Sequence, residues 1–383
     1  MFDIASGPDT LRLLAIPFFA YVAMLDIRTR RVPNRTWIPL AALAVLLLVW
    51  DILRVMTGDT DPVMRQNFYI QTLISIGLVI PLAYVFWLVG GFGGADAKAF
   101  FVVAVLFPAF PVYRLWEWSV NGGAVAGALD LLPGATYAGT LPLVEPSFGV
   151  FSITVLSNTV VMGALYPVAL AARNTTVGYI SPGMFVAKPV AWDRATEEYG
   201  TLLQMPERSL RESLSPSGLR AYLSFRGVDL DALRMYLRWR GLSLSALREN
   251  PDRFRNPASL SPDPNRPGDG AIPTDGRDDE TATDGTTATA FGDAEPWAPE
   301  THLVANGDDP WGAAAFLDDI EGSAYGTSAE TLREGLDSLA DDDVVWISPG
   351  IPFLVPLFVG LVLAFVYGDL LFAMFQALGI GAA

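Results

Sequence analysis

The stretch LRLLAIPFFAYVAMLDIRTRRVPNR occupies residues 11–35 and contains the features that decide the fold. An apolar helix needs about 20 residues to cross the hydrocarbon core of a membrane. Leu11–Leu25 has only 15 residues, so a full crossing must include Asp26 near its far end. A carboxylate inside a membrane span is costly and marks a candidate functional residue. The sequence therefore predicts a first span over 11–30, with Asp26 close to one membrane surface.

Apolar runs of similar length recur along the chain and predict an all-α polytopic membrane protein with six transmembrane helices. The expected spans are 11–30, 36–56, 68–89, 97–114, 149–172 and 347–370. The connection after the first span carries Arg28, Arg30, Arg31 and Arg35, and short arginine-rich loops stay on the cytoplasmic side. Alternation then places both termini outside and the long 173–346 segment in the cytoplasm.

The composition is uneven along the chain. The mean hydropathy is +0.36, yet the formal net charge is −16. Most of the excess acid lies in 263–343, which indicates an acidic soluble insertion in a membrane protein. Lysine occurs only at Lys98 and Lys188, and the other cationic side chains are arginine. This balance indicates adaptation to high salt, where dense carboxylates keep the protein surface hydrated and the salt screens their mutual repulsion. A GC-rich genome, which also replaces lysine with arginine, is the alternative explanation.

The large cytoplasmic insertion before the last helix is expected to be partly helical and partly disordered. The predicted regions are a membrane core 1–172, a helical insertion 173–256, an acidic disordered linker 257–326, a short cytoplasmic helix 327–343, and the last span with the C-terminus 347–383. Thr327 and Glu330 predict the capping box that opens the short helix.

The helical insertion contains a repeat, in which Tyr222–Arg234 and Tyr236–Arg248 are identical at 8 of 13 positions. Gly227 and Gly241 stand at equivalent positions before an Asp or a Ser, which predicts a helix end followed by a new helix start. We interpret the repeat either as a small structural bundle or as an arginine-rich and aromatic surface toward anionic lipid headgroups.

The chain has no cysteine and a single histidine, His302, in the acidic region. Thiolate nucleophiles, Cys-ligated metals and Ser-His-Asp catalysis are therefore excluded. Carboxylates remain, and Asp26 and Asp96 are the candidates because two spans between them return both to one membrane face. Such a pair can activate a water with the ionised carboxylate and protonate the leaving nitrogen with the other. The structural alternatives are an N-cap role for Asp96 and an ion pair of Asp26 with Arg30.

Glycines precede the second carboxylate, at Gly90, Gly91, Gly93 and Gly94. Glycine lets irregular backbone line a cavity at membrane depth and lets a substrate strand approach closely. In the fifth span, Asn158 is expected to form an interhelical hydrogen bond and no catalytic contact.

Both acidic segments resemble those of one family, the type IV prepilin peptidases and their archaeal preflagellin (prearchaellin) peptidase branch. DIRTRRVPN, Asp26–Asn34, is similar to their first catalytic segment, and GGADAK, Gly93–Lys98, is similar to the GxGD signature that they share with other intramembrane aspartic proteases. The final SPGIPFLVPLFVG, Ser348–Gly360, resembles the Pro-rich last helix of the archaeal branch. Ala95 departs from the signature, which has glycine there.

The resemblance implies an aspartic endopeptidase that removes the short basic leader from archaellin or type IV pilin precursors at the cytoplasmic membrane face. It implies that Asp26 and Asp96 are catalytic; the supporting residues would be Pro33, Asn34, Gly93, Gly94, Ala95 and Lys98. Lys98 would either set the local potential or extend to the membrane interface. The expected partners are precursor proteins and the lipid bilayer, with no cofactor, no metal and no nucleic acid. The lack of cysteine indicates the archaeal type, without N-methylation.

Two other functions compete with this one. The same two carboxylates could bind a cation or relay protons in a transporter. Alternatively, the chain could be an inactive membrane scaffold whose role lies in the 173–346 segment.

Overall fold

The computed structural model describes residues 5–58, 60–89, 91–114, 140–144, 149–180, 182–204, 227–272, 309–320, 324–350 and 352–379. The chain forms two compact units. The terminal unit combines Met1–Tyr166 with Pro352–Ala383, and the inserted unit is Pro167–Ile351. Each unit is described by itself.

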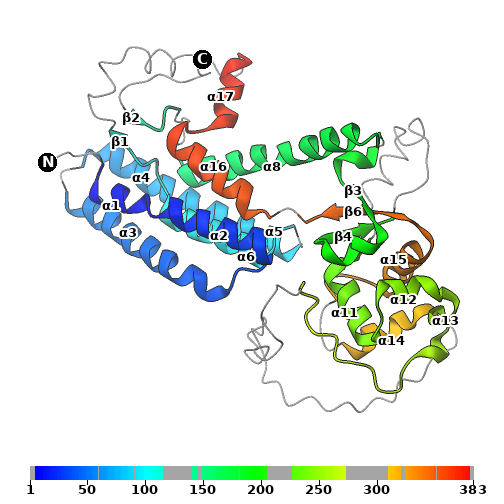
Figure 1. The fold of residues 1–383 in the computed structure, drawn as a ribbon. Helices are drawn as coiled ribbons and strands as arrows, with labels where there is room; N and C mark the ends of the chain where they lie inside the picture. The colour runs from blue at the N-terminus through cyan, green and yellow to red at the C-terminus, as the bar shows by residue number, and fades with distance from the viewer. Residues whose placement is uncertain are drawn as a thin grey trace. The chain divides into compact units, whose positions relative to one another are not determined.

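The terminal unit is built mainly from helices (Figure 1). Its helices are α1 (Gly7–Arg12), α2 (Ala15–Thr29), η1 (Asn34–Trp37), α3 (Ile38–Thr57), α4 (Pro62–Ile74), the π-helical η2 (Ser75–Val79), α5 (Ile80–Leu88), α6 (Gly94–Leu106), the first part of α8 (Phe151–Thr176), α16 (Leu354–Val366) and α17 (Leu370–Ala377). A short antiparallel pair joins β1 (Tyr113–Arg114) to β2 (Thr140–Leu141). Helix α16 packs along α2, and α3 packs along α6.

Within the described residues, four helical stretches are long and apolar enough to cross a membrane. They are Gly7–Thr29, Asn34–Thr57, Pro62–Leu88 and Phe151–Thr176. The other two expected spans are shorter than predicted, since α6 and α16 have 13 residues each, or roughly 20 Å of helix. Helix α6 ends before Pro108 and Pro111, which cannot continue it. The lengths thus support four of the six expected spans.

Aromatic side chains fill the core between these helices. Phe107, Phe151 and Phe365 are each at most 3% exposed and contact one another with ring centroids 5.2–5.3 Å apart. The predicted interhelical role of Asn158 is confirmed. Its side-chain amide donates to the Gly368 carbonyl at 2.8 Å and accepts from the Leu370 N–H at 3.0 Å, which ties α8 to the break between α16 and α17.

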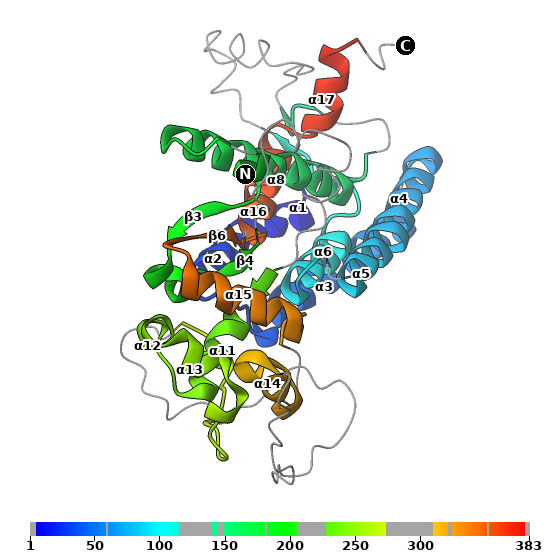
Figure 2. The same cartoon turned by 90° about the vertical axis from the view of Figure 1, so that its right-hand side faces the viewer.

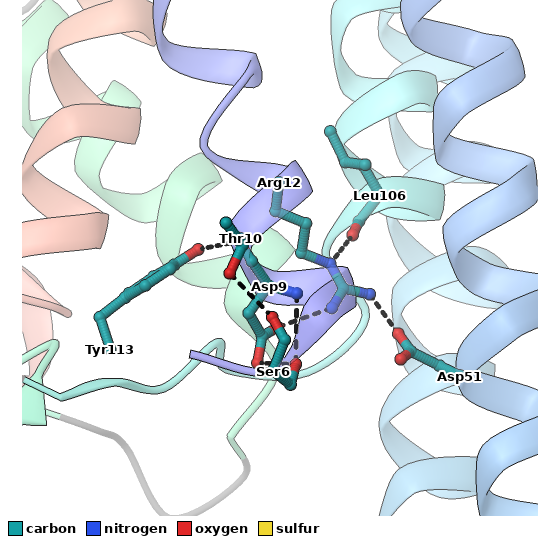
Figure 3. A network of polar contacts seen from close by, with 7 residues as sticks. All are labelled: Ser6, Asp9, Thr10, Arg12, Asp51, Leu106 and Tyr113. Atoms are coloured by element: carbon teal, nitrogen blue, oxygen red, sulfur yellow. Dashed lines mark hydrogen bonds and ion pairs between the residues drawn. The ribbon is translucent and has the colours of Figure 1, made fainter. Parts of the chain in front are cut away.

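A buried polar network ties the end of α1 to α3 and α6 (Figure 3). Arg12 is 5% exposed, and its guanidinium donates to the Leu106 carbonyl at 2.7 Å, at the end of α6. It also forms ion pairs with Asp9, at 2.7 Å, and with Asp51 of α3. The Tyr113 hydroxyl donates to the Asp9 carbonyl at 2.9 Å. The buried Arg12 cation is tolerated here because the Leu106 carbonyl and the carboxylates of Asp9 and Asp51 supply it with acceptors.

The inserted unit contains a four-stranded antiparallel sheet. Its strands are β3 (Lys188–Ala191), β6 (Val344–Pro349), β4 (Gly200–Leu203) and β5 (Gly227–Asp229), in that spatial order. The register pairs Lys188 with Ile347 in β6, and Leu202 of β4 with the same Ile347. The central strand β6 therefore holds the ends of the insertion together.

Helices of the inserted unit gather about this sheet (Figure 2). They are η3 (Pro182–Phe185), η4 (Trp192–Glu197), α11 (Leu230–Arg240), α12 (Leu244–Glu249), α13 (Pro251–Arg255), η5 (Pro257–Ser259), η7 (Pro310–Gly312), α14 (Ala313–Asp319) and α15 (Ala329–Asp341). Helix α15 buries Leu332, Leu336 and Leu339, which share one face at helical spacing. They pack in a core with Trp239 and Trp311, which are at most 1% exposed.

The all-α prediction is wrong for the inserted unit. Three of its strands have only three or four residues, too few for a clear alternating pattern. The fourth, VVWISP of β6, overlaps the start of the span that we expected at 347–370. Its β-branched residues favour extended backbone, and the helix α16 begins only at Leu354, after Pro349 and Pro352.

The disordered linker predicted over 257–326 is wrong where the structure describes it. Residues 309–320 contain η7 and α14. Trp311 and Phe316 of this segment are fully buried in the core of the inserted unit, and their packing holds the segment in a folded conformation. Residues 273–308, with His302, lie outside the described residues. The predicted capping box is displaced by one residue. Ser328 is the N-cap of α15, and its partner is Thr331 in place of Glu330.

The repeat folds as predicted only in its second copy. Gly241 ends α11 in the left-handed conformation, at φ 66°, and Ser243 caps α12. Gly227 instead lies in strand β5, where a Cβ would meet the Leu202 carbonyl at 2.4 Å. Asp229 does cap α11, but the residues before Gly227 in the first copy lie outside the described ones.

Candidate active site

Asp26 lies near the end of α2 and is buried, at 9% exposed. Helix α2 ends at Arg30, whose left-handed backbone, at φ 54°, donates its N–H to the Asp26 carbonyl at 2.9 Å. The backbone of Leu354, the first residue of α16, lies beside the Asp26 carboxyl. The start of a helix has free N–H groups and favours negative charge. The start of α16 is thus a favourable neighbour for this carboxyl.

Asp96 lies in the first turn of α6 and is half-buried. Its Oδ2 accepts the N–H of Gly93, the N-cap residue, at 2.9 Å. Asp96 therefore does cap its own helix, as the structural alternative predicts, though from the third helical position. The Asp26 and Asp96 carboxyls lie within electrostatic range of each other. Capping fixes the direction of this carboxyl and leaves its other oxygen available for chemistry.

Gly93 is the glycine that the site most clearly requires. Its backbone is extended, with φ −69° and ψ 160°, so the requirement is space and not a left-handed conformation. A Cβ at Gly93 would lie 3.0 Å from Asp96 Oδ2, which is tighter than an ordinary contact. Ala95, the departure from the family signature, lies within α6. Alanine adopts helical backbone readily, and its methyl group packs against the core of the terminal unit.

The structure brings Asn34 and Lys98 together. The Lys98 ammonium donates to the Asn34 side-chain oxygen at 2.5 Å, which joins η1 to the second turn of α6. Pro33 precedes this contact and is exposed. The ammonium group also lies 3.9 Å from the Cβ position of Gly94, near the start of α6. The two acidic segments are thus joined by the hydrogen bond between Asn34 and Lys98 and also bring their carboxyls near each other.

Sequence reasoning missed the contribution of the start of α16. The sequence pattern predicts only that Phe353 and Leu354 belong to a Pro-rich last span, and it indicates no role for either residue. A backbone contact carries no side-chain signal, so only the fold could reveal it. Among the described residues, no group of three or more His, Cys, Asp or Glu side chains could hold a metal ion.

Comparison with protein families gives two matches along the chain. Residues 13–168 match the type IV leader peptidase family, peptidase A24, and residues 318–370 match the archaeal peptidase A24 C-terminus type II. The first match contains Asp26 and Asp96, and the second contains β6 and α16. No curated protein and no solved structure matches the chain significantly.

The apolar helices and the two matches define a multi-pass membrane protein and an aspartic leader peptidase, a hydrolase. The chain belongs to the type IV leader peptidase family and carries the archaeal type II C-terminal region of that family. Both family matches include elements of the candidate site, because α2, α6 and α16 each contribute to it.

Proposed function

We propose that Asp26 and Asp96 form the catalytic dyad of this peptidase and that it removes the short basic leader from archaellin or type IV pilin precursors. The observation that carries the proposal is the approach of the two carboxyls, which are 70 positions apart in the sequence and lie within electrostatic range. The Asp96 carboxyl accepts the N–H of Gly93, and the Asp26 carboxyl lies beside the backbone of Leu354.

A pair of carboxyls that shares one proton can hydrolyse a peptide bond without a metal. The ionised member removes a proton from water, which attacks the scissile carbonyl carbon. The protonated member donates a hydrogen bond to the carbonyl oxygen and then a proton to the leaving nitrogen. The carboxyls exchange roles with each turnover, so the dyad is restored when the products leave.

We propose that the dyad faces the cytoplasm in a six-pass arrangement with both termini outside. The arginines that follow Asp26, at Arg28, Arg30, Arg31 and Arg35, support this orientation. A basic leader stays on the cytoplasmic side by the same charge rule, so its junction with the following apolar helix would meet the dyad. The inserted unit would then also lie in the cytoplasm. We further propose that its acidic composition reflects a host with high internal salt.

The test of the dyad is the size shift of a leader-bearing precursor co-expressed with the peptidase. We expect Asp26→Asn and Asp96→Asn each to abolish leader removal while the protein still inserts into membranes. Asp61→Asn is the matched control, because Asp61 is an exposed N-cap of α4 and asparagine caps equally well. Normal processing by either dyad variant would refute the assignment.

Substrate class is tested separately, by supplying archaellin and pilin precursors one at a time. A basic leader should be required, so replacing its Lys and Arg residues with Gln should slow cleavage of every true substrate. Cleavage of unrelated membrane proteins at comparable rates would contradict the proposed specificity.

A further inference from the structure

Each candidate catalytic carboxyl lies beside a backbone amide whose preceding residue is a phenylalanine. Phe353 precedes Leu354, which contacts Asp26, and Phe92 precedes Gly93, which contacts Asp96. The rings of Phe92 and Phe353 contact each other, with centroids 5.0 Å apart and planes at 45°. The two backbone amides are therefore joined through this pair of side chains.

The rings belong to a larger aromatic cluster at this end of the terminal unit. Phe92 stacks on Phe86 of α5 at 5.1 Å and on Phe100 of α6 at 5.5 Å. Phe353 lies 6.0 Å from Phe100, which is fully buried. Aromatic pairs at these distances have preferred relative orientations. Three elements, α5, α6 and α16, are thus fixed against one another beside the dyad.

The backbone around Phe92 has little stiffness of its own, because Gly91, Gly93 and Gly94 surround it. On one side it is anchored by the N–H groups of Gly91 and Phe92, which donate to the Phe86 carbonyl at 2.8 and 3.1 Å. Toward α16 it is anchored by the ring of Phe92, which contacts Phe353 directly and also through Phe100, whose ring lies against both. The separation of the two backbone amides depends on these ring contacts.

We propose that Phe92 and Phe353 are positioning residues that set the distance between the Asp26 and Asp96 carboxyls. The inference rests on the proposed dyad, and it assigns a function to the start of α16. Without the ring contact, the start of α16 and residues 91–93 would move independently, and the Asp26 carboxyl on α2 and the Asp96 carboxyl on α6 would each lose a fixed backbone neighbour. A displacement of about 1 Å in a catalytic group can reduce the rate by about 100-fold.

The experiment measures kcat and KM for cleavage of a purified precursor by the full-length peptidase in lipid bilayers. We expect Phe92→Ala and Phe353→Ala each to lower kcat by about 10-fold to 100-fold, with little change in KM. The double variant should be scarcely worse than either single one, since both remove the same contact. Phe353→Tyr keeps the ring and should restore most of the rate.

Phe110→Ala is the matched control, because Phe110 is also half-buried and loses a ring contact of 5.1 Å with Phe151. It should keep the wild-type kcat. An equal loss of kcat in this control would show a general effect on folding and overturn the inference. A rise in KM alone at Phe92 or Phe353 would indicate substrate contact and overturn it as well.

Failure of the inference and failure of the dyad give different patterns. If Asp26→Asn and Asp96→Asn abolish cleavage but the ring variants cleave at the wild-type rate, only the positioning role is refuted. If the Asn variants cleave normally, the dyad is wrong and the positioning role is refuted with it.

Discussion

The two units place polar and apolar side chains in opposite ways. The terminal unit exposes large apolar side chains such as Leu46 and Leu73, at 67% and 72%, and buries polar groups in shared networks. Its buried polar residues include Arg12, Asp26, Ser75, Ser152, Thr154, Asn158 and Asp369. The inserted unit buries Trp239 and Trp311 and displays paired charges, such as Arg255 with Asp337 and Asp341.

This contrast follows from the solvent that each unit requires. In hydrocarbon, a polar group finds no water, so every buried donor and acceptor must be satisfied by the protein. The Ser75 hydroxyl shows this, because it donates to the Ala104 carbonyl at 2.7 Å and lies 2.6 Å from the Ser152 hydroxyl. In water, an exposed ion pair adds little to the stability of the fold, because the solvent competes for both partners. The contrast predicts mutational effects of different size in the two units.

The largest effect is expected for Arg12→Ala. The change leaves the carboxylates of Asp9 and Asp51 without their cation, and both are at least 85% buried. Loss of one partner of a buried pair costs about 3–5 kcal/mol. The midpoint of thermal unfolding in detergent micelles should fall accordingly. Arg54→Ala, at an exposed position of α3, should change it little.

An intermediate effect is expected for Gly360→Ala, where α16 meets α8. A Cβ at Gly360 would lie 2.8 Å from the Thr159 backbone nitrogen, so the helices must separate. Overpacking of this kind costs about 1–3 kcal/mol. Gly163→Ala is the control in α8, because nothing lies within 4 Å of its Cβ position. It should be neutral or stabilise by up to about 1 kcal/mol. Equal stability of the two variants would contradict close helix packing in the terminal unit.

The smallest effect is expected for Arg255→Ala on the surface of the inserted unit. Arg255 contacts Asp337 and Asp341 at 2.9 Å, and both acids are about half exposed or more. Its loss should cost at most about 1 kcal/mol, and the difference from wild type should shrink as salt rises. Unfolding monitored at low and high KCl measures it. A cost equal to that of Arg12→Ala would break the contrast between the units.

The catalytic candidates were accessible to sequence reasoning because each is an unusual residue in a local pattern. Asp26 interrupts an apolar run, and Asp96 follows a glycine-rich segment. Asn34 and Lys98 were marked by the same segments, and the structure joins them. Arg12 was not recognised, although it lies in the first expected span. Asp9 lies three positions before it in α1, but Asp51 and the Leu106 carbonyl belong to distant helices, so no local pattern shows that Arg12 is buried among acceptors.

Residue type over short windows was enough to predict four of the long apolar helices, the two acidic segments and the family to which they belong. Tertiary packing, in contrast, placed the backbone of Leu354, more than 300 positions from Asp26, beside its carboxyl. It also decided that short extended segments of the insertion pair through β6. Backbone hydrogen bonds and ring contacts between distant elements depend on where packing places the chain, and residue type alone does not encode that placement.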